Sequence, residues 1–236
     1  MTSPAALALA DPAEAADLAA FLGRLLRFDR AAAVRLQAVP GDAGEAQQGA
    51  GVLAVFGRLP LGTAGAVAVR TARLASLTAA ADLTVSAGQL LEGVDEDGGT
   101  VAVPTSVTGP AWAGLLPPRT GWKPLGELAA DQIFPQLMSG VREFKERSAA
   151  VPEQHRSRAV LDELADEIWA RPLDAVPALP LRAAHAAYVI GFLHPGVPLS
   201  AHRAGGWLRL NAPHGSVAVR AAAAPGAGLG LTPLMA

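Results

Sequence analysis

Hydrophobic positions in the first third of the chain predict one helix followed by three strands. Apolar residues recur at helical spacing between Leu18 and Leu26, and Asp11 followed by Pro12 is typical of a helix start. We therefore expect a helix from Pro12 to about Phe28. Alternating apolar and polar residues then predict strands at 31–39, 52–59 and 65–74, the last two joined by the turn PLGTAG.

The last third of the chain repeats this order. Three helical patterns span residues 128–147, 156–170 and 181–193, and strand patterns follow at 197–204, 207–211 and 216–220. The phrase GRLPLGTAGAVAVR at 57–70 is similar to GGWLRLNAPHGSVAVR at 205–220, and each closes a helix–strand–strand–strand series. An alignment with one extra residue in the second turn matches Val67 with Val217 and Arg70 with Arg220. We interpret the chain as an α+β fold of two αβββ-like units with antiparallel meanders.

The same pattern divides the chain into four segments. An N-terminal α+β unit covers residues 1–105, and a crossing rich in proline and glycine covers residues 106–125. A helical middle segment and the C-terminal α+β unit cover residues 126–223, and residues 224–236 are expected to form a flexible tail. Free linkers seldom contain tryptophan, so Trp112 and Trp122 predict that the crossing packs on a folded unit.

The two units are predicted to pair edge to edge in one six-stranded antiparallel sheet with both helices on one face. Such pairing hides two strand edges, and it can occur within one chain or between two chains of a dimer. Because side chains alternate along a strand, one set should face the helices and another the opposite face or the strand ends. The first set is Leu59, Leu61, Val67, Val69, Leu208, Leu210, Val217 and Val219; the second is Arg58, Arg70, Trp207, Arg209 and Arg220.

Composition places the chain among globular proteins. Hydrophobic residues make up 51% of it and charged residues 17%, which is enough apolar material for a core. The chain has no cysteine, which excludes disulfides, thiolate metal sites and thiol nucleophiles. The first residues lack the basic segment of a signal peptide, and no run of about 18 uncharged apolar residues predicts a membrane span. We therefore expect a cytoplasmic protein that does not contact membranes.

Charge is distributed unevenly along the chain, although the net charge is only −2. Residues 175–236 contain no Asp or Glu but carry four arginines and four of the five histidines. Arginine binds phosphate or carboxylate through two parallel hydrogen bonds, and tryptophan beside it adds a stacking surface. The open sheet face therefore either carries arginines for solubility alone or binds anions. The candidate anion- or nucleic-acid-binding residues are Arg35, Arg58, Arg70, Arg203, Trp207, Arg209 and Arg220.

Catalytic and metal motifs are weaker. The histidines at 185, 194, 202 and 214 do not have the usual spacing of zinc ligands, so we expect no metal site, and His185 reads as a core residue with a hydrogen-bond partner. No cofactor is expected, because GAGLGL at 226–231 lacks the spacing of a dinucleotide motif. A hydrolase would have to use His202 or His214 with a carboxylate from the acidic helix. That helix carries Asp162, Glu163, Asp166 and Glu167.

Three hypotheses of function remain. The first is a non-enzymatic binding or scaffold protein that acts through its sheet faces, with an anionic ligand, a protein partner or a second copy of itself. The second is a nucleic-acid-binding regulatory protein, in which the acid-free C-terminal unit places its helix and a wing-like hairpin against phosphates. The third is the hydrolase. No catalytic constellation is visible, which favours the first.

Overall fold

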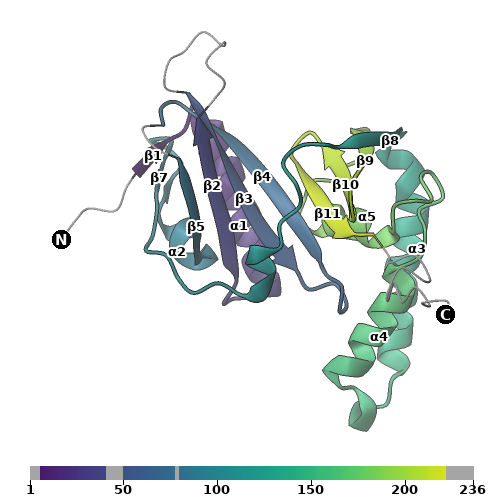
Figure 1. The fold of residues 1–236 in the computed structure, drawn as a ribbon. Helices are drawn as coiled ribbons and strands as arrows, with labels where there is room; N and C mark the ends of the chain where they lie inside the picture. Colours follow the sequence, from purple (N-terminus) through teal and green to yellow (C-terminus); the bar gives the residue numbers. More distant parts are fainter. Residues whose placement is uncertain (1–5, 41–49, 78–79, 222–236) are drawn as a thin grey trace, which may run out of the picture.

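The computed structural model describes residues 6–40, 50–77 and 80–221 (Figure 1). Its helices are α1 (Pro12–Phe28), α2 (Ala87–Glu92), α3 (Ala130–Ala150), α4 (Arg158–Trp169) and α5 (Leu181–Val189), with 3-10 turns η1 (Ala111–Gly114) and η2 (Glu153–His155). The first seven strands are β1 (Ala6–Ala8), β2 (Ala33–Pro40), β3 (Gly51–Leu59), β4 (Ala66–Leu74), β5 (Ala81–Ser86), β6 (Val94–Asp95) and β7 (Thr100–Ala102). The others are β8 (Lys123–Ala129), β9 (Pro198–Ala204), β10 (Trp207–Ala212) and β11 (Gly215–Arg220).

One antiparallel sheet runs through both halves of the chain. Its strand order is β5-β2-β3-β4-β11-β10-β9-β8, and β4 and β11 form the junction at its centre. The helices α1 and α5 lie behind the sheet in Figure 1, so both cover the same face. The structure confirms the predicted α+β fold of two units. The sheet has eight strands instead of the six expected, because β5 and β8 extend its two outer edges.

The first helix shows how the local sequence determines an element. The Asp11 side chain accepts a hydrogen bond from the backbone N–H of Ala13, and Pro12 occupies the first helical position. The helix ends at Phe28, as predicted. Its apolar stripe is buried against β3 and β4, and each fully buried leucine or phenylalanine stabilises the fold by about 1.5–3 kcal/mol. The stripe consists of Leu18, Phe21, Leu22 and Leu25.

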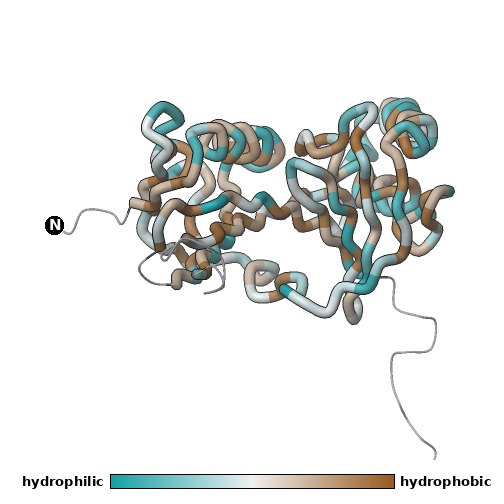
Figure 2. The backbone as a smooth tube through the Cα atoms, turned by 90° about the horizontal axis from the view of Figure 1, so that it is seen from above, coloured by the Kyte–Doolittle hydropathy of each residue, from teal (hydrophilic) through white to brown (hydrophobic). Residues whose placement is uncertain are grey.

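The junction of the two units lies within one chain. Ala68 of β4 is directly opposite Val217 of β11, and both are completely buried. Behind the junction the rings of Phe21 and Phe192 stack with their centroids 5.9 Å apart. A single hydrophobic core therefore continues from one unit to the other, and Figure 2 shows hydrophobic positions running through the middle of the molecule. The strand pairing of the two units does not call for a second chain.

The predicted facing of β4 is wrong. Six of the eight apolar side chains expected to face the helices do so, but Val67 and Val69 lie on the opposite face, packed against Phe56 and Trp207. The register explains this error. Val217 faces the helices and is directly opposite Ala68, and opposite residues share a face, so Ala68 and not Val67 faces the helices. The alignment of Val67 with Val217 is therefore shifted by one residue. Arg70 consequently points to the helix side, contrary to the prediction.

The crossing covers much of the face of the sheet that carries no helix. It begins beside β5, where the Val107 N–H donates to the carbonyl of Thr84, and ends in β8 at the other edge (Figure 1). Its side chains at Trp112, Leu116 and Trp122 pack on the cluster around Val67 and Val69. The crossing thus packs on the sheet, as its tryptophans predicted, although its last residues 123–125 are the start of β8.

The remaining elements complete the outline. Strands β1, β7 and β6 form a small second sheet, and α3 and α4 form a helical hairpin beyond β8 and β9 (Figure 1). Within the described ranges, no helix is long and apolar enough to cross a membrane. The tail predicted at 224–236, with its GAGLGL phrase, lies outside the described residues.

The junction yields a stability prediction. Val217→Asp should lower the free energy of unfolding by more than about 4 kcal/mol, because it places an unpaired charge in the centre of the core. Val52→Asp, on a β3 residue that is 37% exposed, should cost less than about 1 kcal/mol. Urea unfolding of both variants measures this. Equal losses would show that β11 is not central to the sheet.

Candidate anion-binding surface

The pairing of the strands places several arginine and tryptophan side chains close together, on the face of the sheet that no helix covers. Trp207 begins β10 and is directly opposite Arg220, the last residue of β11. Arg209 lies two residues further along β10 on the same face, and Arg58 lies on that face of β3, opposite Val67. Trp122 joins them from the crossing. We call this set the arginine–tryptophan surface: Arg58, Trp122, Trp207, Arg209 and Arg220.

Two of its arginines stack on indole rings. The guanidinium carbon of Arg220 lies 4.2 Å from the ring centroid of Trp207, and that of Arg209 lies 4.7 Å from the ring centroid of Trp122. These distances are those of cation–π contacts. Arg209 Nε also donates to Ser216 Oγ at 3.1 Å. The stacking holds each guanidinium plane in place and leaves hydrogen-bond donors at its edges for a ligand.

Arg58 leans toward the same end of the sheet. Its Nη2 donates to the Thr63 carbonyl at 3.1 Å, and its side chain crosses Gly65, where an added Cβ would lie 2.8 Å from Arg58 Nε. Gly65 also has a φ of 62°, a conformation that glycine adopts without strain. Glycine therefore fits this position both because it leaves room for Arg58 and because of its backbone conformation. Continuing the β4–β11 register by two residues places Gly65 beside Arg220.

The positive charge of this surface is not neutralised by the protein. Among the residues that the structure describes, none of Arg58, Arg209 and Arg220 forms an ion pair with a carboxylate. Burial lowers the pKa of the Arg209 guanidinium, which means that its charged form is desolvated without compensation. Like charges held together are unfavourable, and an anion placed among them would offset that cost.

The other three predicted arginines lie elsewhere. Arg35 is on the same sheet face but pairs with Asp82, and the hydrogen bond from Arg35 lowers the pKa of that carboxyl. Arg70 is buried on the helix side, where it pairs with Asp17 of α1 and donates to the carbonyl of His214. Arg203 is exposed at the end of β9, opposite Leu208 and therefore on the helix side of the sheet.

The acidic helix does not supply a carboxylate to the histidines. Asp162, Asp166 and Glu167 pair with Arg158, Arg182 and Arg147, respectively. Within the described part of the chain, no hydrogen bond or ion pair joins His202 or His214 to a carboxylate. Nor does that part contain a group of three or more His, Asp or Glu side chains able to hold a metal ion.

His185 is half-buried and packs on the core residue Trp169, but one of its nitrogens lacks the expected partner. Its ring stacks on Trp169 with centroids 3.8 Å apart, and its buried Nδ1 has no hydrogen-bond partner among the described residues. Burial lowers the pKa of His185 to about 4. This histidine is therefore neutral at physiological pH and takes no part in the arginine–tryptophan surface.

Sequence reasoning missed the contribution of Trp122. The sequence places this residue in a crossing that packs on a folded unit, and nothing in the local pattern indicates which arginine it contacts. One signal was available: residues 98–126 contain no Asp or Glu, so the crossing extends the acid-free composition of the C-terminal unit.

Comparison with known families divides the chain in two. Residues 2–114 match a family model described as a domain of unknown function (DUF8010), and residues 117–224 match another described in the same words (DUF8185). The two matches adjoin within the crossing. No curated protein matches the chain.

His185 predicts a pH dependence of stability. Its folded-state pKa is below the ordinary value of about 6.5, so the unfolded chain binds more protons between these two values. Stability should therefore be fully present above about pH 6.5 and fall as the pH drops toward 4, by about 2 kcal/mol at pH 5. His185→Phe, which retains an aromatic ring on Trp169, should remove this loss in urea unfolding.

An exposed histidine provides the control for that measurement. His155→Gln on η2 should keep the wild-type pH dependence, because His155 is exposed. An unchanged pH dependence in the His185→Phe variant would contradict the assignment.

Proposed function

We propose that this chain is a non-enzymatic binding protein that recognises an anionic ligand through the arginine–tryptophan surface. The observation that carries the proposal is the convergence of Arg58, Arg209 and Arg220 on one end of a sheet face without a carboxylate partner among the described residues. Arg58 and Arg220 are exposed and Arg209 is half-buried. Most other buried or half-buried arginines of the described chain have carboxylate partners, as Arg70 and Arg182 do.

The chemistry of the surface favours phosphate, sulfate or carboxylate groups. A guanidinium offers a planar fork of N–H donors that matches two oxygens of such a group, and charge-assisted hydrogen bonds are about twice as strong as neutral ones. The stacks on Trp122 and Trp207 reduce the rotamer freedom that binding would otherwise remove. The ligand class is therefore a molecule that carries at least two anionic groups, since Arg209 and Arg220 project from neighbouring strands.

Two features of the structure disfavour the nucleic-acid and hydrolase hypotheses. The nucleic-acid hypothesis placed the helix 181–193 against phosphates, but six of the nine residues of α5 are buried against the rest of the protein, and its Arg182 pairs with Asp166. The hydrolase hypothesis required carboxylates that are engaged with arginines. The two unit edges that self-association was expected to use, β4 and β11, pair with each other within one chain.

Binding to heparin and to tripolyphosphate tests the proposal. At low salt the wild-type protein should be retained on heparin despite its net charge of −2. The double variant Arg209→Gln with Arg220→Gln should lose retention, because glutamine keeps a planar side chain over each indole but removes the charge. Its affinity for tripolyphosphate should fall by about 100-fold, given about 1.5 kcal/mol for each charged hydrogen bond lost.

A matched pair of arginines elsewhere separates the surface from overall charge. Arg142→Gln with Arg158→Gln removes two positive charges from exposed positions on α3 and α4 and should leave both affinities unchanged. Equal losses in the two double variants, or no retention of the wild type, would overturn the proposal. Oligothymidylate serves as a third probe, and tighter binding than to tripolyphosphate, at equal salt, would favour the nucleic-acid hypothesis instead.

A further inference from the structure

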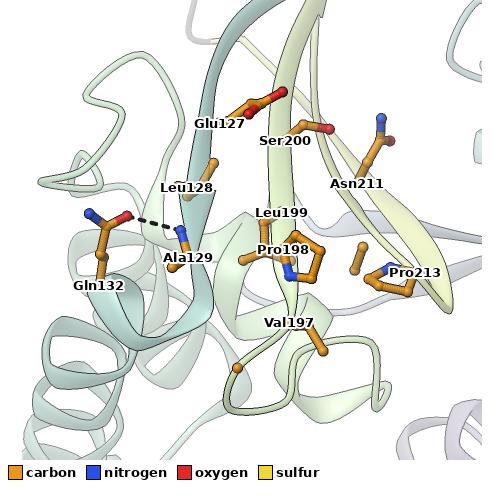
Figure 3. Close-up of a pocket in the computed structure, with 12 residues that line it drawn as sticks. Glu127, Leu128, Ala129, Gln132, Val197, Pro198, Leu199, Ser200, Asn211 and Pro213 are labelled. Atoms are coloured by element: carbon orange, nitrogen blue, oxygen red, sulfur yellow. Dashed lines mark hydrogen bonds between the residues drawn. The ribbon is translucent and has the colours of Figure 1, made fainter.

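A hollow of about 750 Å³ lies beside the arginine–tryptophan surface, further along β8 to β10. It is formed by the end of β8, the start of β9, the end of β10 and the first turn of α3 (Figure 3). One wall is apolar, with prolines that hold the backbone rigid. That wall consists of Val197, Pro198, Leu199, Ala212 and Pro213.

The polar side chains of the hollow form one register row. Glu127 of β8 is directly opposite Ser200 of β9, which is directly opposite Asn211 of β10. Figure 3 shows the three side chains side by side above the prolines. Neighbouring strands are about 4.8 Å apart, so one small ligand group can reach two members of the row at once.

This row offers hydrogen-bond acceptors. Asn211 Nδ2 lies 3.3 Å from His202 Nδ1, and an amide nitrogen can only donate, so the Oδ1 atom of Asn211 remains for a ligand. Glu127 contributes a carboxylate and Ser200 a hydroxyl. No hydrogen bond or ion pair within the described residues uses the Glu127 carboxylate, the Ser200 hydroxyl or Asn211 Oδ1.

The charge on the residues that line the hollow is negative, while Arg209 lies two residues before Asn211 on the same face of β10. Glu127 is the one charged lining residue of the hollow, and no Lys, Arg or His is among the residues that line it, all of which belong to the described part of the chain. Asp131 lies at the rim, where its Oδ1 accepts from the Gly196 N–H at 3.4 Å. The C-terminal unit has no acidic residue of its own, so both carboxylates come from the segment that precedes it.

We propose that this hollow is a second binding site, for a small organic cation that carries a primary ammonium group on a short apolar chain. An ammonium has three N–H donors and no acceptor, which complements two neighbouring acceptors of the row, the Glu127 carboxylate and the Ser200 hydroxyl. The apolar chain lies along the proline wall and loses contact with water there. The hollow would thus bind a cation, whereas the arginine–tryptophan surface would bind an anion.

The two sites use different residues but are neighbours on β10. Arg209 lies two residues before Asn211 on the same face, about 7 Å along the strand, and it donates to Ser216, which is directly opposite Asn211. The second site stands on the hollow and its acceptors alone, and a failure of heparin binding would leave it untouched.

Nuclear magnetic resonance titration with three matched probes tests this site. Hexylamine, protonated at pH 7, should shift the backbone amide signals of Ser200 and Asn211 with a Kd near 1 mM, as expected for a ligand of its size. Hexanol has the same chain without the charge, and hexanoate has the opposite charge. Hexanol should bind at least about tenfold more weakly than hexylamine, and hexanoate should not bind.

Glu127→Gln should raise the Kd for hexylamine about tenfold and leave the Kd for hexanol unchanged. The side chain is exposed, so the variant should fold, and the amide signals of α1 report directly on that. Glu163→Gln on α4 is the control and should bind hexylamine like the wild type. Equal affinities for hexylamine and hexanol, no shift of either amide, or an unchanged affinity in Glu127→Gln would each overturn the proposal.

Discussion

The antiparallel pairing of β4 with β11 is the interaction on which the rest of the structure depends. Each unit alone is a half-sheet with one edge of unpaired backbone groups and a helix that covers only its own strands. Pairing within the chain satisfies that edge, places Ala68 opposite Val217, and brings Phe21 of α1 against Phe192 beyond α5. One core and one continuous face result, and the crossing then packs across that face.

The pairing also determines which partner each arginine contacts. Side chains on the helix side of the junction meet carboxylates, and Arg70 there is held by Asp17 of α1. Side chains on the other side meet a crossing and strands that contain almost no acids, so Arg209 and Arg220 stack on indoles instead. The carboxylate of Glu127 enters only at the far end of β8. The helix-free face of the sheet therefore carries a group of arginines and, further along β8 to β10, a row of hydrogen-bond acceptors, and we propose a different class of ligand for each.

The sequence predicts an element of this fold well when one face of that element is polar and the other is apolar. The helix Pro12–Phe28 was predictable to the residue, because its cap and its apolar stripe agree. The facing of β4 was not, because both of its faces are buried and AVAV carries no polar position to distinguish them. Strand β8 was missed because Pro124, Gly126 and a register shift interrupt its alternation. The meeting of Arg209 with Trp122 depends on the path of the crossing, which no local pattern specifies.

The register of the junction can be measured directly, because the chain has no native cysteine. Val69 and Ser216 are directly opposite each other, and such pairs have Cα atoms about 4.5–5.5 Å apart, within the range of a disulfide. Under mild oxidation, the double variant Val69→Cys with Ser216→Cys should form a disulfide within the monomer, as seen by mass spectrometry without reduction. Val69→Cys with Val217→Cys, whose side chains point to opposite faces, should not. Cross-linked dimers, or equal cross-linking of both pairs, would contradict the intrachain sheet.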